Sequence, residues 1–130
     1  MADETDRILE YYRRELKWNP PFAEILTRYA PDGLGGYLAM REAVQNGPLP
    51  RATRELLFCL LDSMDDEASG AKAHAAAAIE AGLTMEELTE AFLIVTIVKG
   101  INVLCKTGVE ALRAAEERAN ELKAENRSKN

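Results

Sequence analysis

Residues 67–88 read Glu-Ala-Ser-Gly-Ala-Lys-Ala-His-Ala-Ala-Ala-Ala-Ile-Glu-Ala-Gly-Leu-Thr-Met-Glu-Glu-Leu, and this stretch decides the fold class. The alanine-rich part predicts a helix over residues 67–81, because alanine has the highest helix propensity. Gly82 suits the left-handed position that often follows a helix. Thr84-Met85-Glu86-Glu87 is a capping box, which predicts that a second helix covers residues 85–98.

Helical patterns continue on both sides of this stretch. No segment shows a sustained alternation of polar and apolar residues, so the sequence predicts an all-α fold. Gly100 is expected to break the chain before a last helix, and the charged end of that helix is expected to fray. Proline positions and apolar spacing predict a turn at residues 30–33 and upstream helices over residues 5–17, 22–29, 34–44 and 50–62.

Composition excludes some classes of partner. The chain has 130 residues, which suits one domain, and a formal net charge of −6. No cluster of lysine and arginine interleaved with aromatic residues stands out, so neither nucleic acid nor an anionic membrane is an expected partner. An anionic substrate would have to meet a few local positive groups.

The cysteines and the N-terminus indicate a reducing compartment. Cys59 and Cys105 form no Cys-x-x-Cys pattern, and the N-terminus has no apolar signal segment. We therefore expect a cytoplasmic protein whose cysteines are small packing residues. The apolar run from Ala91 to Val98 ends at Lys99, and a membrane span needs about 20 apolar residues.

His74 is the only histidine in the chain. Gly70 lies one helical turn before it and Glu67 two turns before it, so the three share a helix face. Small alanine side chains leave the imidazole as the bulky group on this surface. Two interpretations are open: a structural histidine bonded between helices, or a proton donor or acceptor, since imidazole exchanges protons near neutral pH.

Glu55 and Lys99 also have two interpretations each. Glu55 directly precedes the apolar stripe of its helix, where it lies at the core edge or pairs with Arg51 one turn away. Lys99 ends an apolar helix, where it caps carbonyl groups or binds a substrate carboxylate. A single histidine without a Cys-x-x-Cys pair argues against zinc or iron, so no metal or cofactor is predicted, although a carboxylate-only magnesium site stays open.

The order of motifs resembles the carboxymuconolactone decarboxylase and alkylhydroperoxidase D-like family over residues 49–112. The residues that carry the resemblance are Leu49-Pro50, Glu55-Leu56-Leu57, His74 and the segment from Ala78 to Leu88. It implies a helical bundle in a single domain, residues 1–130, with N-terminal helices over 1–48, a core over 49–122 and a frayed tail over 123–130. It also implies a homo-oligomer, a trimer or a hexamer.

The redox branch of this family carries a Cys-x-x-Cys pair before the histidine. Carried over to this chain, the two cysteine positions fall on Glu67 and Gly70, and the conserved glutamate and histidine of the family fall on Glu55 and His74. Disulfide chemistry needs two thiols, so thiol peroxidase activity is not expected from these positions.

The decarboxylase branch also lacks the pair, and the resemblance to it implies an acid–base enzyme without a cofactor. Its substrate would be a small cyclic or unsaturated carbonyl compound or lactone acid of aromatic-compound catabolism. His74 would deliver a proton, Glu55 would orient the imidazole, and Glu67 would act as a base. Lys99 would hold a carboxylate, and Gly70 would line the substrate position. An isomerase or hydrolase, a non-catalytic oligomeric binding protein and a thiol-dependent peroxidase using Cys59 or Cys105 are the alternatives.

Overall fold

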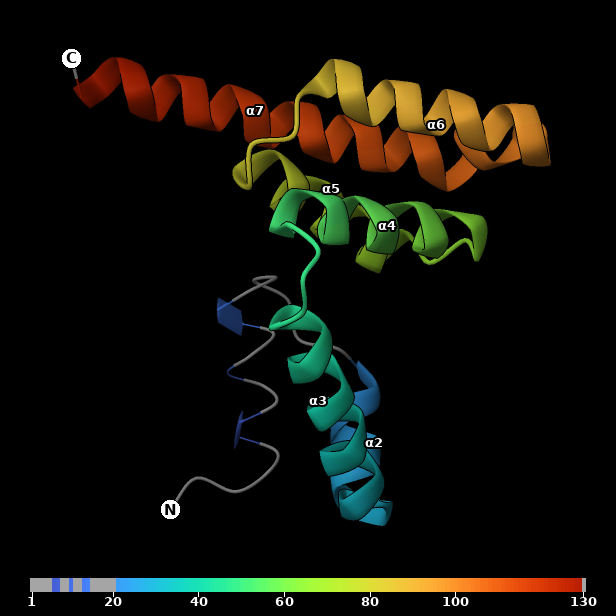
Figure 1. The fold of residues 1–130 in the computed structure, drawn as a ribbon, viewed down its shortest axis with the longest axis vertical. Helices are drawn as coiled ribbons and strands as arrows, with labels where there is room; N and C mark the ends of the chain where they lie inside the picture. The colour runs from blue at the N-terminus through green and yellow to red at the C-terminus, as the bar shows by residue number, and fades with distance from the viewer. Residues whose placement is uncertain (1–5, 8–9, 11–12, 15–20, 130) are drawn as a thin grey trace. The chain divides into compact units, whose positions relative to one another are not determined.

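The computed structural model describes residues 6–7, 10, 13–14 and 21–129, and every regular element among them is a helix (Figure 1). The all-α prediction is therefore confirmed. The chain forms two compact units, Met1–Pro48 and Leu49–Asn130. The helix predicted over residues 5–17 lies mostly outside the described residues. Within the described part, no helix combines the length and the apolar character that crossing a membrane requires.

The first unit contains α2 (Pro21–Tyr29) and α3 (Pro31–Gln45). The Phe22 and Tyr37 rings meet edge to face, with ring centroids 5.4 Å apart, and tie the two helices together. The turn predicted at residues 30–33 is wrong, because α3 begins at Pro31, directly after Ala30. Proline fits the first turn of a helix, where its missing N–H group has no partner to lose.

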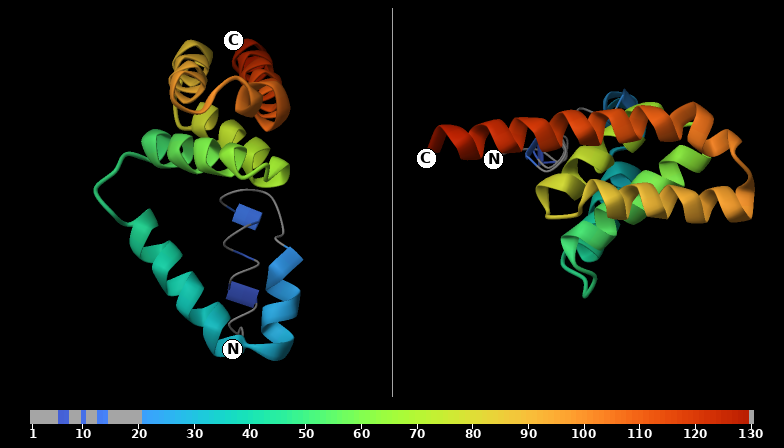
Figure 2. Two further views of the ribbon diagram at one scale, coloured as in Figure 1. Left: turned by 90° about the vertical axis from the view of Figure 1, so that its right-hand side faces the viewer. Right: turned by 90° about the horizontal axis from the view of Figure 1, so that it is seen from above.

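The second unit is a two-layer arrangement of four α-helices. One layer holds α4 (Arg51–Met64) and α5 (Ala68–Glu80), and the other holds α6 (Met85–Lys99) and α7 (Val109–Lys129). Within each layer the two helices run side by side (Figures 1 and 2). Helix α5 makes its most extensive contacts with α4 and α7, so it links the layers.

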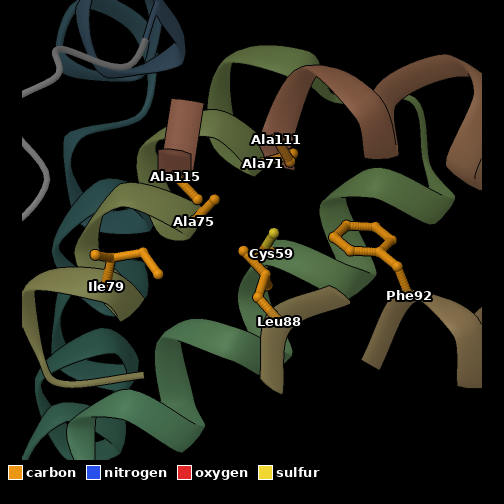
Figure 3. Packing of buried hydrophobic residues seen from close by; sticks show 8 residues of the cluster. All are labelled: Cys59, Ala71, Ala75, Ile79, Leu88, Phe92, Ala111 and Ala115. Carbon is orange, nitrogen blue, oxygen red and sulfur yellow. The ribbon is translucent and has the colours of Figure 1, made fainter. Parts of the chain in front are cut away.

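The core of the second unit lies between these layers (Figure 3). Small alanines on facing stretches of α5 and α7 let the two helices approach closely, and Phe92 of α6 fills the space beside them with no exposed surface. The buried cluster consists of Cys59, Ala71, Ala75, Ile79, Leu88, Phe92, Ala111 and Ala115.

The connection between α4 and α5 is a tight turn over three residues. Asp66 is left-handed, with φ 56°, and its N–H group donates to the Ser63 carbonyl. The Glu67 N–H group donates to the Asp62 carbonyl at 2.8 Å, which completes a Schellman motif. The buried Thr107 hydroxyl donates to the Asp66 carboxylate at 3.3 Å. This hydrogen bond ties the turn to the segment that connects α6 to α7.

The connection between α5 and α6 follows the sequence-based prediction. Gly82 has φ 104°, and the Leu83 N–H group donates to the Ala78 carbonyl at 3.0 Å, again as a Schellman motif. The capping box is present: Thr84 Oγ1 accepts from the Glu87 N–H group, and the Glu87 carboxylate accepts from the Thr84 N–H group. Hydrogen bonding of the Glu87 carboxylate, first to the Thr84 backbone N–H group and then to the Thr84 side chain, lowers the pKa of this carboxyl.

Replacement of Gly82 by alanine is expected to reduce the free energy of unfolding by about 1 kcal/mol, because a Cβ atom is disfavoured at positive φ. Urea unfolding followed by circular dichroism measures this loss. Gly82→Asn is the matched control, since asparagine tolerates the left-handed region, and it should lose less. Equal stability of the alanine variant and the parent protein would contradict the prediction.

The segment between α6 and α7 contains η1 (Leu104–Gly108), where helical turns meet at a kink: Lys106 has φ −95° and ψ −106°, which are not helical. Gly100, with φ 90°, ends α6 as predicted. A Cβ atom at Gly108 would stand 2.8 Å from the Val103 carbonyl oxygen and 3.1 Å from the Phe92 ring, so only glycine lets this backbone rest on the core. Helix α7 continues to Lys129 with exposed side chains from residue 123 onward, and the predicted fraying stays a prediction.

Candidate functional site

The α4–α5 pair joins a buried carboxylate to a buried imidazole. Glu55 lies in the second turn of α4, and His74 lies in the middle of α5. His74 Nδ1 is 2.6 Å from Glu55 Oε2, and the two residues are only 4% and 6% exposed. The tight turn over residues 65–67 brings the two helices side by side, so residues nineteen positions apart come into contact.

This hydrogen bond fixes which imidazole nitrogen remains reactive. A carboxylate only accepts hydrogen bonds, so the imidazole donates from Nδ1–H and Nε2 is left to exchange a proton. The Phe58 ring stacks on the imidazole, with centroids 4.8 Å apart and planes 27° apart, and limits its rotation. Together Glu55 and Phe58 hold the imidazole in one orientation, as an acid–base group requires.

A second carboxylate lies on the other side of the imidazole. Asp62 Oδ2 is 3.8 Å from His74 Nε2, and the Asp62 side chain is 32% exposed. Sequence reasoning missed this residue. A signal was available, because Asp62 follows Glu55 by two helical turns and therefore lies on the same face of α4.

The Asp62 carboxylate occupies space that is free because residue 70 is a glycine. Gly70 is buried, and a Cβ atom there would collide with Asp62 Oδ2 and stand 3.1 Å from Asp62 Cγ. The structure therefore brings Gly70 together with Glu55 and His74, and it adds Asp62 to them.

The two other predicted site residues lie apart from the imidazole. Glu67 precedes α5 and is exposed, and its Cγ atom lies 3.4 Å from where a Gly70 Cβ would stand. Lys99 is exposed in the last turn of α6. Among the described residues, no hydrogen bond or ion pair joins Glu67 or Lys99 to His74 or Glu55. The predicted roles of Glu67 as a base and Lys99 as an anchor stay predictions.

The cysteines are free thiols in contrasting environments. Cys59 is fully buried in the core, and Cys105 is exposed in η1. Burial in apolar surroundings raises the pKa of the Cys59 thiol to about 12, against a weaker opposing effect of Ser63. A thiol with so high a pKa is a poor nucleophile at neutral pH.

We expect iodoacetamide to alkylate Cys105 and leave Cys59 unmodified in the folded protein. At pH 8 a thiol of pKa about 12 is ionised in roughly one molecule in ten thousand, and burial blocks access as well. Mass spectrometry of proteolytic peptides distinguishes the two sites, and in urea both should react. Rapid labelling of Cys59 without denaturant would contradict the assignment and would reopen thiol chemistry at this residue.

Two surface hollows among the described residues run along α6 and the start of α7, and none of Glu55, Asp62, Gly70 or His74 lines these two. The residues that line them include Met85, Thr89, Leu93, Leu112 and Glu116. Within the same part of the chain, no three His, Cys, Asp or Glu side chains are grouped as metal ligands would be.

Comparisons with known proteins agree with this architecture. The sequence profile of the carboxymuconolactone decarboxylase family matches residues 31–121. The chain is similar to a proposed carboxymuconolactone decarboxylase from Burkholderia xenovorans LB400, whose crystal structure superposes with a TM-score of 0.83 at 30% sequence identity. That match covers 94% of this chain and 96% of the other. No curated protein matches significantly. The chain belongs to the carboxymuconolactone decarboxylase family.

Proposed function

We propose that this protein is an acid–base enzyme that works without a cofactor on a small cyclic or unsaturated carbonyl compound, lactone acids of aromatic-compound catabolism included. One observation carries the proposal: the buried hydrogen bond between Glu55 and His74 Nδ1, which leaves Nε2 for proton exchange. The family of the chain supports lyase chemistry of the decarboxylase type.

The chemistry of a lactone acid fits these groups. When the bond to the carboxylate carbon breaks, its electron pair stays on the ring and spreads into the conjugated carbonyl group as a dienolate. Protonated Nε2 of His74 then gives its proton to carbon and becomes a neutral imidazole. The Glu55 carboxylate keeps its hydrogen bond to Nδ1 and holds the imidazole in orientation during the transfer, and solvent returns the proton afterwards.

Lys99 and Glu67 have secondary roles in this proposal. Lys99 would hold a substrate carboxylate, and Glu67 would act as a further base beside Gly70. Both side chains are exposed, so they are accessible to a small molecule. Their assignment comes from the sequence and the family resemblance.

A second candidate is a non-catalytic, oligomeric binding protein. One observation favours it: α6 carries exposed apolar side chains, with Leu93 51%, Ile97 84% and Val98 75% exposed. Apolar stripes of this kind mark association surfaces. Association between copies of the chain is compatible with both candidates.

Proton exchange at carbon tests the proposal without knowledge of the true substrate. The protein is incubated in D₂O with five-membered unsaturated lactones, some with a carboxylate and some without, and proton NMR follows signal loss and decarboxylation. We expect exchange or decarboxylation of at least one lactone well above the buffer rate, and we expect His74→Gln to remove it. If every lactone reacted only at the rate seen in buffer, or if the His74→Gln variant kept the rate of the parent protein, the acid–base function would be rejected and the binding protein favoured.

A further inference from the structure

We propose that Asp62 is the catalytic residue that meets the substrate, passing protons between it and His74, and that Gly70 makes this position possible. The inference rests on the proposed acid–base function. It assigns a role to a carboxylate that lies outside the pair of Glu55 and His74.

Asp62 is the most exposed of the three groups. The side chains of His74 and Glu55 are 5% and 9% exposed, whereas the Asp62 side chain is 32% exposed. A small molecule that approaches α4 and α5 near their connecting turn would therefore meet the Asp62 carboxylate before the imidazole. The imidazole lies between two carboxylates, with Nδ1 toward Glu55 and Nε2 toward Asp62.

The distance between Asp62 and His74 suits a transfer that closes during the reaction. The separation of 3.8 Å between Oδ2 and Nε2 is longer than a hydrogen bond. Rotation of the short aspartate side chain shortens it, and catalytic hydrogen bonds often tighten only when the substrate is bound. Glu55 and Phe58 hold the imidazole in place on its other sides.

The proton balance is simple. Protonated Asp62 gives its proton to a substrate carbanion or dienolate, a C–H bond forms, and the carboxylate remains. Protonated His74 then gives the Nε2 proton to Asp62 Oδ2 and becomes neutral. Solvent reprotonates the imidazole. The reverse order removes a proton from carbon, so the same groups serve either direction.

Gly70 determines whether this relay exists. Any side chain at residue 70 would place its Cβ atom against Asp62 Oδ2 and push the carboxylate away from Nε2. The atom that must move is Asp62 Oδ2, at the end of a flexible side chain rather than in the backbone, so we expect Gly70→Ala to fold. It therefore displaces the carboxylate without removing its charge from the protein.

The experiment compares Asp62→Asn and Gly70→Ala with Ser69→Ala, an exposed control on the same helix. The first readout is deuterium exchange of a neutral unsaturated lactone. We expect both site variants to lose about 10-fold or more of the rate and the control to keep it.

The second readout is ¹⁵N NMR of the single histidine at fixed pH, which needs no substrate. Loss or displacement of the Asp62 carboxylate should change the chemical shift of Nε2, because the charged group beside this nitrogen is removed, while Nδ1, which faces Glu55, should change less. If His74→Gln abolishes exchange but both site variants keep the full rate, His74 meets the substrate directly and the inference about Asp62 is wrong. An unchanged Nε2 resonance in both site variants would also overturn it. Absence of exchange in the parent protein would instead reject the proposed function, and the Nε2 readout would still test the contact.

Discussion

Replacement of His74 by glutamine is expected to lower the turnover of the true substrate by about 100-fold or more. His74 is the group with a nitrogen available for proton exchange, and the glutamine amide cannot carry a proton between states. The amide can still donate to Glu55, so the buried carboxylate keeps a partner and the fold should survive. Steady-state kinetics with circular dichroism as the check on folding measure this loss, which corresponds to about 2.7 kcal/mol of transition-state stabilisation.

Glu55→Gln should reduce turnover by a similar factor for a different reason. The amide is nearly the same shape as the carboxylate, but its NH₂ group can donate to Nδ1 and favour the wrong tautomer of the imidazole. Glu110→Gln is the matched control, because Glu110 is an exposed glutamate of α7 that has no role in the proposed site. Turnover that survives in Glu55→Gln but falls in Glu67→Gln would move the base to Glu67.

The largest effect on stability is expected from Phe92→Ala. Phe92 is fully buried, and the backbone of Gly108 rests against its ring, so truncation leaves a cavity that the helices cannot close without a shift of η1. A loss of about 3–5 kcal/mol in the free energy of unfolding is expected. Urea denaturation of the parent protein and the variant gives the difference.

Ile97→Ala is the control for this measurement. Ile97 lies on the same helix as Phe92 but is 84% exposed, and its truncation should change the free energy of unfolding by about 0.5 kcal/mol or less in the monomer. Comparable losses in the two variants would mean that Ile97 is buried in an assembly or that Phe92 is not the centre of the core.

Signals confined to a few residues were readable from the sequence. The capping box at Thr84, the left-handed Gly82 and the break at Gly100 are each decided by local backbone chemistry, and the structure confirms them. Pro31 shows the limit of such signals. Proline is common in turns, which is why a turn was predicted at residues 30–33, but it is also common in the first turn of a helix, and α3 begins there.

The site needed information that one segment does not hold. Glu55 and His74 were found through the resemblance to the family, whereas Asp62 matters only because α4 packs on α5 and because residue 70 has no side chain. Neither condition is visible along one helix. The positions of Glu67 and Lys99 likewise depend on how their helices pack, and helical spacing alone did not determine what they contact.

The close pairing of α4 and α5 also bears on the order of folding. Glu55 and His74 lie nineteen positions apart in the sequence, and a single tight turn between α4 and α5 brings them together. Loop-closure entropy grows slowly with length, and contacts at short sequence separation form fast. We expect the acid–base groups to meet in the same early step that forms this helical hairpin. Helix α7 would then dock onto a site that is already assembled.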